Sequence, residues 1–235
     1  MLAIAHRGAS GYAPENTRAA FDLALTMGAG AIETDVQLSA DGEAVIFHDE
    51  TVDRASDGHG PLGDYTLEEL QVLDLGGWFR AAFAGQRLLT LAELLDEYAG
   101  RIPLALEIKD ARAAAATIAA LAARELRKDI QVTSFHWPAL LDAQALDPKQ
   151  FYGFLTPTFD EDTIARVARR GFAQICPHVE RLTARRVAFA HRLGLHVRAW
   201  GVTRRDQVER LFETGADGAT CNWPDWITSE AARPR

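Results

Sequence analysis

The sequence predicts an α/β protein, a (β/α)8 (TIM) barrel with a small insertion after the hairpin that follows the second strand. Short β-rich runs alternate with amphipathic helical runs along the chain, which indicates parallel βαβ units. One of nine candidate strands belongs to a hairpin, so eight remain for a closed barrel. A length of 235 residues suits one such barrel, with two small domains as the alternative.

The candidate strands are β-rich runs flanked by turn or helix signals. In order they are Leu2–His6, Ala31–Leu38, Ala44–His48, Leu104–Lys109, Gln131–Phe135, Phe151–Leu155, Ala173–Cys176, His196–Trp200 and Gly218–Cys221. The helical stretches are Thr17–Met27, Ala111–Arg127, Pro138–Leu146, Asp160–Arg170, Thr183–Leu193 and Arg205–Thr214. Asn16, Asp160 and Thr183 are the expected N-caps of three of these helices.

The second and third strands are joined only by residues 39–43, which contain the dipeptide Asp41-Gly42. Five residues are too few for a parallel crossover, and Asp-Gly is a hairpin signal. We therefore expect an antiparallel pair. Folding about this turn places His48 roughly opposite Asp35, so the hairpin helps to build a polar site.

Residues 51–87 fit no simple βα unit. They contain a glycine-rich turn segment, a capping-box helix start at Thr66 and three aromatic residues. We expect a single domain over residues 1–235, with this insertion of about residues 51–87 over the barrel mouth. Long excursions in compact domains are usually functional. An extra surface hairpin and helix is the alternative.

The composition argues against several classes of partner. A net charge of −8, a pI near 5.4 and the lack of a basic stripe disfavour a nucleic-acid or membrane-binding surface. No run has the roughly 18 apolar residues that a membrane span needs, and the N-terminus lacks signal-peptide character. We expect a cytoplasmic protein with no nucleic-acid partner and no stable membrane association, and the oligomeric state stays open. Cys176 and Cys221 are expected to be free, buried thiols.

Acidic residues are placed to face the barrel interior. Side chains alternate along a strand, so Glu33 and Asp35 share one face, as do Glu107 and Lys109. Three buried carboxylates would repel one another, so either some are protonated or a cation binds them. Oxygen ligands favour Mg²⁺ or Ca²⁺ over zinc, and Mn²⁺ would also fit. We therefore predict one divalent cation bound by Glu33, Asp35 and Glu107.

Two histidines end strands at the edge where barrel active sites lie. His6 closes the first strand and His48 the hairpin strand. Histidine titrates near neutral pH, so this pair could supply a general base and a general acid. Arg7 offers a forked donor set for phosphate oxygens, and Lys109 adds a positive charge. Together these residues predict chemistry on a phosphate ester beside a metal ion.

Each residue also has a structural explanation when taken alone. A lone histidine usually forms structural hydrogen bonds, Glu107 and Lys109 could form an exposed ion pair, and Arg7 could pair with Glu33 or Asp35. Their coincidence on neighbouring segments favours function.

Three further residues have two possible roles each, and a fourth has one. Trp200 and Phe135 could wall a substrate pocket, and core packing is equally open for both. Glu15 either braces Arg7 or reaches the substrate. Asn16 is best explained as a helix cap.

The chain resembles the glycerophosphodiester phosphodiesterase family in a set of short motifs. These are His6-Arg7-Gly8, Pro14-Glu15-Asn16-Thr17, Glu33-x-Asp35-Val36, the Asp41-Gly42 turn, His48-Asp49 and Glu107-x-Lys109. The resemblance implies a TIM barrel with a small glycerol-side insertion, and it assigns the metal, acid–base and phosphate-binding roles to the same residues as above. The closing run Thr220-Cys221-Asn222 matches only loosely, since an apolar-Thr-Asp run is commoner there. No catalytic role is expected at that run.

The activity implied is metal-dependent hydrolysis of a small glycerophosphodiester to sn-glycerol 3-phosphate and an alcohol, through a cyclic phosphate. One alternative is a phospholipase-type phosphodiesterase acting on lyso or intact lipids, which would need an apolar rim. Proton abstraction by Lys109, as in enolase-like barrels, predicts carboxylates on successive strands instead. A binding barrel that senses phosphoesters is the non-enzymatic alternative, and the histidine pair argues against it.

Overall fold

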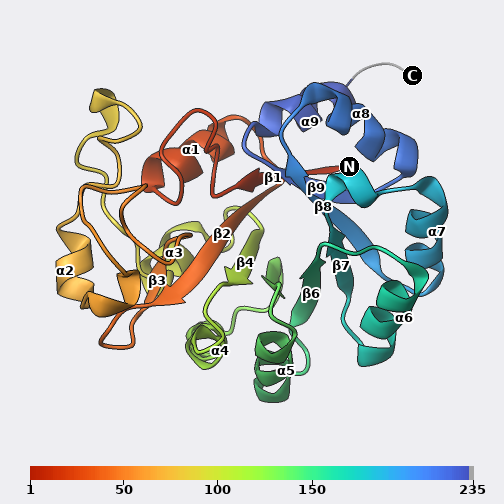
Figure 1. Cartoon of the computed structure of the whole chain (residues 1–235), viewed down its shortest axis with the longest axis horizontal. Coiled ribbons are helices and arrows are strands. Elements are labelled where there is room, and N and C mark those ends of the chain that lie inside the picture. The colour runs from red at the N-terminus through yellow and green to blue at the C-terminus, as the bar shows by residue number, and fades with distance from the viewer. Residues whose placement is uncertain (233–235) are drawn as a thin grey trace.

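The computed structural model describes residues 1–232, in which nine strands form one sheet that closes on itself (Figure 1). The strand order is β1-β9-β8-β7-β6-β5-β4-β2-β3, and β1 also pairs with β2. Every pairing is parallel except that of β2 with β3. Without the hairpin strand β3, eight parallel strands close the barrel, which confirms the predicted fold.

The strand bounds lie close to the predicted ones. They are β1 Leu2–His6, β2 Ala31–Leu38, β3 Ala44–Ile46, β4 Leu104–Ile108, β5 Ile130–Ser134, β6 Phe151–Thr156, β7 Gln174–Pro177, β8 His196–Val202 and β9 Gly218–Cys221. The α-helices are α1 Arg18–Thr26, α2 Leu67–Gln71, α3 Leu91–Tyr98, α4 Ala113–Ala123, α5 Trp137–Leu146, α6 Glu161–Arg170, α7 Ala184–Arg192, α8 Arg205–Thr214 and α9 Pro224–Ala231.

Two helices, α3 and α9, were not predicted from the sequence. A capping box between Thr90 and Glu93 starts α3, and Pro224 occupies the first turn of α9. The prediction that Asn16 caps the first helix is wrong. Thr17 caps α1 instead, because its side chain accepts from the Ala20 amide, whereas Asn16 is buried and bonds elsewhere.

The hairpin strand β3 ends at Ile46, two residues earlier than predicted. The Phe47 amide donates to the Asp35 carbonyl, and the side chain of Gln37 then donates to the carbonyls of Phe47 and Asp49. Beyond Phe47, hydrogen bonds from the Gln37 side chain thus take the place of backbone hydrogen bonds between the two strands. His48 therefore lies in a loop, free of strand alternation, one residue past the position opposite Asp35.

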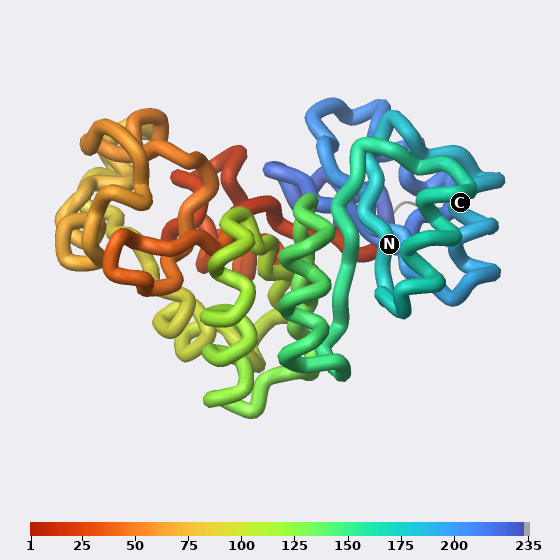
Figure 2. The backbone as a smooth tube through the Cα atoms, turned by 60° about the horizontal axis from the view of Figure 1, so that its bottom comes forward, coloured from red at the N-terminus to blue at the C-terminus, as the bar shows by residue number. Residues whose placement is uncertain are grey.

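Within residues 1–232, the buried hydrophobic residues gather in two clusters. The larger one fills the layer between the barrel strands and the surrounding helices. The smaller one belongs to the hairpin and the segment after it, and its members are Val45, Phe47, Val52, Ala55, Leu62, Leu70, Leu75 and Leu88. Figures 1 and 2 show this segment, in orange and yellow, as a lobe at one side of the barrel. Residues 51–87 therefore share with the hairpin a hydrophobic core that is separate from that of the barrel.

Both cysteines are buried and free, as expected. Among residues 1–232, no helix is both long enough and apolar enough to cross a bilayer.

Candidate active site

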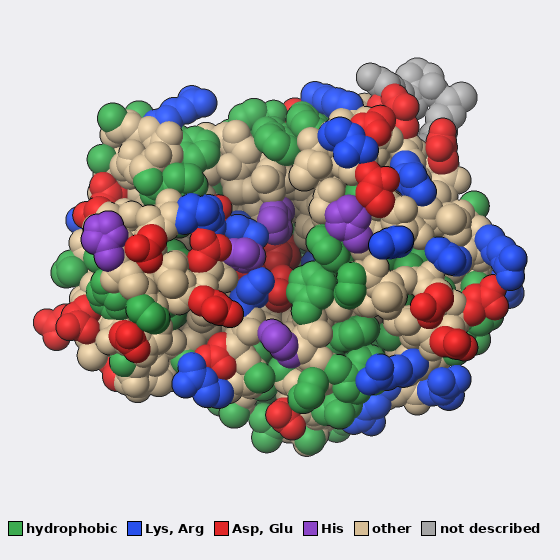
Figure 3. All heavy atoms as spheres, viewed as in Figure 1, with side chains coloured by type: hydrophobic (Ala, Val, Ile, Leu, Met, Phe, Trp, Pro, Cys, Tyr) green, Lys and Arg blue, Asp and Glu red, His purple; other side chains and the backbone are tan. Residues whose placement is uncertain are grey.

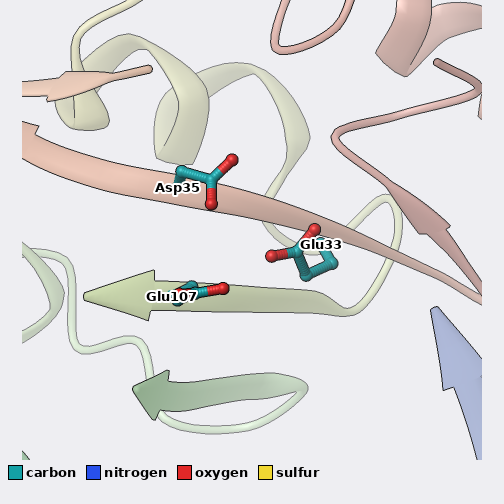
Figure 4. A group of neighbouring side chains, drawn as sticks. All are labelled: Glu33, Asp35 and Glu107. Atoms are coloured by element: carbon teal, nitrogen blue, oxygen red, sulfur yellow. The ribbon is translucent and has the colours of Figure 1, made fainter. Parts of the chain in front are cut away.

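Three carboxylates meet inside the barrel. Glu33 and Asp35 come from β2 and Glu107 from β4, where the parallel register pairs Asp35 with Glu107. Figure 4 shows the three side chains turned toward one another. Each is buried and offers an oxygen within 4.8 Å of the others. Strand alternation and one strand register therefore suffice to build this acidic group.

The acidic group has the donor set of a hard divalent cation. Asp35 Oδ2 accepts from Asn16 Nδ2 at 3.0 Å, but within residues 1–232 the buried Oδ1 atom has no hydrogen-bond partner. Burial raises the pKa of Glu33 well above its usual range, and the charges of Asp35 and Glu107 raise it further. Burial and then Asp35 raise the pKa of Glu107 to about 7. An acceptor left free among mutually repelling carboxylates suits Mg²⁺, Ca²⁺ or Mn²⁺.

His6 ends β1 and is held from the opposite end of the chain. Its Nδ1 lies 2.6 Å from Asn222 Oδ1, and its Nε2 lies 3.9 Å from Glu33 Oε2. Because an amide oxygen only accepts, we assign the proton to Nδ1 and the lone pair to Nε2. Burial, and next the charge of Arg7, lower the pKa of His6 to about 4. His6 is therefore neutral at pH 7.

His48 is held on both ring nitrogens. Nδ1 lies 2.5 Å from Asp49 Oδ1, and Nε2 lies 3.2 Å from Lys109 Nζ. Burial would raise the pKa of Asp49, but hydrogen bonds from Arg54 and His48 lower it to about 2. Asp49 is thus an anion, so Nδ1 carries a proton and donates it to the carboxylate. Lys109 also approaches Glu107 Oε1 at 3.3 Å, an ion pair that lines the site.

Arg7 follows β1 in a left-handed backbone conformation, with φ of 56°. Its amide donates to the carbonyl of Glu33 at 2.8 Å, which holds this turn. Its Nη1 donates to Glu15 Oε1 at 2.7 Å. Its Nε lies 3.2 Å from Asp35 Oδ2, which is close enough for an ion pair but lacks hydrogen-bond geometry. Both the bracing by Glu15 and the pairing with Asp35 that we considered are therefore present.

The acidic and basic residues line one cavity of about 290 Å³. Figure 3 shows histidine, acidic and basic side chains gathered around a hollow near the centre of this face. Among the expected site residues, the lining consists of His6, Arg7, Glu33, His48, Glu107, Lys109, Phe135 and Trp200. Phe135 and Trp200 meet edge to face, with ring centroids 5.2 Å apart. Glu15 is not part of the lining, since Arg7 and Arg54 hold its carboxylate.

Sequence reasoning assigned no site role to four residues that the structure places there. Asn222 lies in the closing run, where no catalytic role was expected, and it contacts His6; the mismatch in that run was its signal. Asp49 and Arg54 hold His48, and no local pattern marks Arg54. Arg198 on β8 is 2% exposed and lines the cavity. Its Nε and Nη1 lack hydrogen-bond partners in the described chain. The alternation of side chains along the strand already placed Arg198 on the same inward face as Trp200.

Comparisons with known proteins agree on one family. The model of the glycerophosphoryl diester phosphodiesterase family matches residues 6–226. The chain is 36% identical to a putative glycerophosphodiester phosphodiesterase, YhdW, of Bacillus subtilis, with 98% of each chain covered. It is 34% identical to a glycerophosphodiester phosphodiesterase of Caldanaerobacter subterraneus, with 96% of each covered. A solved phosphodiesterase of Oleispira antarctica, in complex with the product sn-glycerol-3-phosphate, superimposes with a TM-score of 0.92 and 30% identity, covering 99% of this chain and 97% of that one.

Proposed function

Because the chain belongs to the glycerophosphoryl diester phosphodiesterase family and is a phosphodiesterase of that class, we propose that it hydrolyses small glycerophosphodiesters with a divalent metal and two histidines. One observation carries this proposal. His6, His48 and two of the three clustered carboxylates line the same cavity, beside Arg7 and Lys109. The product bound in the Oleispira antarctica relative supports sn-glycerol 3-phosphate as the product here.

The first step uses the two histidines in opposite roles. His6 is neutral at pH 7 and has its lone pair on Nε2, so we assign it as the base that removes the proton of the glycerol 2-hydroxyl. That oxygen attacks phosphorus while His48, in its imidazolium form with a proton on each ring nitrogen, gives the Nε2 proton to the departing alcohol, and a cyclic phosphate forms. Water then opens the ring with the two roles exchanged, which releases sn-glycerol 3-phosphate.

Positive charge faces the reacting phosphate. Arg7 and Lys109 would bind its non-bridging oxygens, Arg7 through its forked donors and Lys109 as a point charge. Glu33, Asp35 and Glu107 would hold the cation, which when bound supplies Lewis-acid stabilisation of charge on the phosphate. Residues 51–87 are proposed to belong to the same domain and to cover one side of the mouth. The cytoplasmic location stays a prediction.

A coupled assay for glycerol 3-phosphate tests the proposal. Glycerophosphocholine and glycerophosphoethanolamine are supplied after chelation and again after Mg²⁺, Mn²⁺ or Ca²⁺ is restored. We expect activity only with metal, and loss of it in His6→Ala and His48→Ala. His59→Ala is the matched control, because this histidine of the lobe has an 87% exposed side chain. Near-normal turnover by either variant, or in chelator, refutes the mechanism. Preference for lysophosphatidylcholine would favour the phospholipase alternative.

A further inference from the structure

Arg54, in the segment after the hairpin, binds two carboxylates at once. Its Nε donates to Asp49 Oδ2 at 2.6 Å and its Nη2 to Asp49 Oδ1 at 3.1 Å. Its Nη1 donates to Glu15 Oε2 at 2.8 Å and its Nη2 to Glu15 Oε1 at 2.6 Å. All three guanidinium nitrogens are therefore used, in two forked contacts on different edges of one plane.

Each of these carboxylates also holds a residue of the proposed mechanism. Asp49 Oδ1 accepts from Nδ1 of His48 at 2.5 Å. Glu15 Oε1 accepts from Nη1 of Arg7 at 2.7 Å. The five side chains therefore form one continuous chain of contacts, with Arg54 at its centre and the two cavity-lining residues at its ends.

Both carboxylates are held as anions. Burial alone would raise the pKa of Glu15, but hydrogen bonds from Arg54 and the charges of Arg7 and Arg54 lower it to about 2. Asp49 has a pKa of about 2 for a related reason, since Arg54 and His48 both donate to it. The contacts thus keep their charge at the pH values where the enzyme is assayed.

We propose that Arg54 is a positioning residue that sets the ring of His48 and the guanidinium of Arg7 relative to each other. The inference rests on the roles given above to His48 and Arg7. A planar fork can serve two carboxylates in one geometry, which a lysine ammonium cannot. The lobe has its own hydrophobic cluster, and Arg54 is 45% exposed, so its ion pairs add little to folding. The ion pairs of Arg54 therefore matter more for the geometry of the site than for the stability of the fold.

The test compares three variants of the full chain assayed with Mg²⁺. In Arg54→Ala we expect kcat to fall on the order of 10²-fold, with KM rising by about tenfold or less, because the substrate contacts stay present but misaligned. Arg54→Lys keeps the charge and loses the fork, so kcat should stay about tenfold below that of the native enzyme. Arg124→Ala is the control. It removes a forked contact to Asp96 on the outer helices and should leave kcat unchanged.

A spectroscopic reading separates positioning from stability. The Nδ1 proton of His48, assigned by its loss in His48→Ala, should shift in the proton NMR spectrum of Arg54→Lys, while the unfolding temperature stays near that of Arg124→Ala. A native kcat in Arg54→Ala or Arg54→Lys, or an unmoved Nδ1 signal, would overturn the inference. If His48→Ala itself remains active, the proposed mechanism fails. An inactive His48→Ala beside a fully active Arg54→Ala defeats only the role of Arg54.

Discussion

Nδ1 of His6 lies 2.6 Å from Oδ1 of Asn222, so the residue that follows the last barrel strand holds the imidazole at the end of the first strand. Closure of the barrel makes this contact, because β1 pairs directly with β9. The partner is a neutral amide. It orients the ring and fixes its tautomer without supplying the negative charge that would stabilise the imidazolium form.

Asn222→Asp should therefore raise the pKa of His6 from about 4, since a carboxylate stabilises the charged ring. The neutral base is then lost at a higher pH. We expect the acid limb of the pH profile of kcat/KM to move upward in pH. Asn222→Ala, the control, should lower kcat/KM without that displacement. An acid limb unchanged in Asn222→Asp would contradict the assignment of His6 as the base.

Metal affinity should weaken as the pH falls from 8 to 6. The pKa of Glu107 is about 7 and that of Glu33 is raised, so protons compete with the cation for the same oxygens. Displacement of one proton per ion corresponds to about a tenfold change in affinity per pH unit. Calorimetric titration with Mg²⁺ or Ca²⁺ at several pH values checks this. An affinity independent of pH would mean that the carboxylates are already ionised without metal.

Glu33→Gln should stabilise the metal-free protein increasingly as the pH rises. The folded-state pKa of Glu33 lies above its unfolded value of 4.5, so between these values the folded state binds more protons than the unfolded state. Its stability then falls with rising pH, by at most about 1.4 kcal/mol per pH unit. Because the introduced glutamine does not titrate, the Glu33→Gln variant does not lose this stability as the pH rises.

Urea unfolding in chelator from pH 5 to pH 9 measures the difference between Glu33→Gln and the native chain. With saturating Mg²⁺ the order should reverse, because only the native chain retains the full set of ligands. Glu209→Gln, which removes an exposed carboxylate of α8, serves as the control. A gap between Glu33→Gln and the native chain that does not vary with pH would argue against the raised pKa.

Gly8→Ala should destabilise the fold much more than Gly28→Ala. Both glycines have positive φ, 80° and 70°, so alanine is strained at either position by about 1 kcal/mol. Only at Gly8 would the new Cβ also clash, at 2.6 Å from the Ala20 carbonyl carbon, whereas nothing lies within 4 Å at Gly28. We expect an additional cost of about 2 kcal/mol or more at Gly8. Equal unfolding midpoints in urea would exclude the clash.

Local patterns in the sequence predicted much of the fold and part of the site. The alternation of strands and helices, the Asp41-Gly42 hairpin and the period-two spacing of Glu33 and Asp35 all depend on near neighbours in the chain, where stereochemistry sets the outcome. A motif resemblance over nearly the whole sequence assigned the same roles to the same expected site residues. The amino-acid sequence alone therefore specifies these features.

Tertiary structure alone decided how those residues are held. Asn16 resembles a helix cap in sequence, yet in the fold it donates to Asp35 and accepts from Thr34, and Thr17 caps the helix. Asn222 reaches His6 across 216 positions, and Arg54 joins two carboxylates 34 positions apart. Such contacts arise from closure of the barrel and docking of the lobe. Because they depend on distances between segments far apart in the chain, no local propensity encodes them.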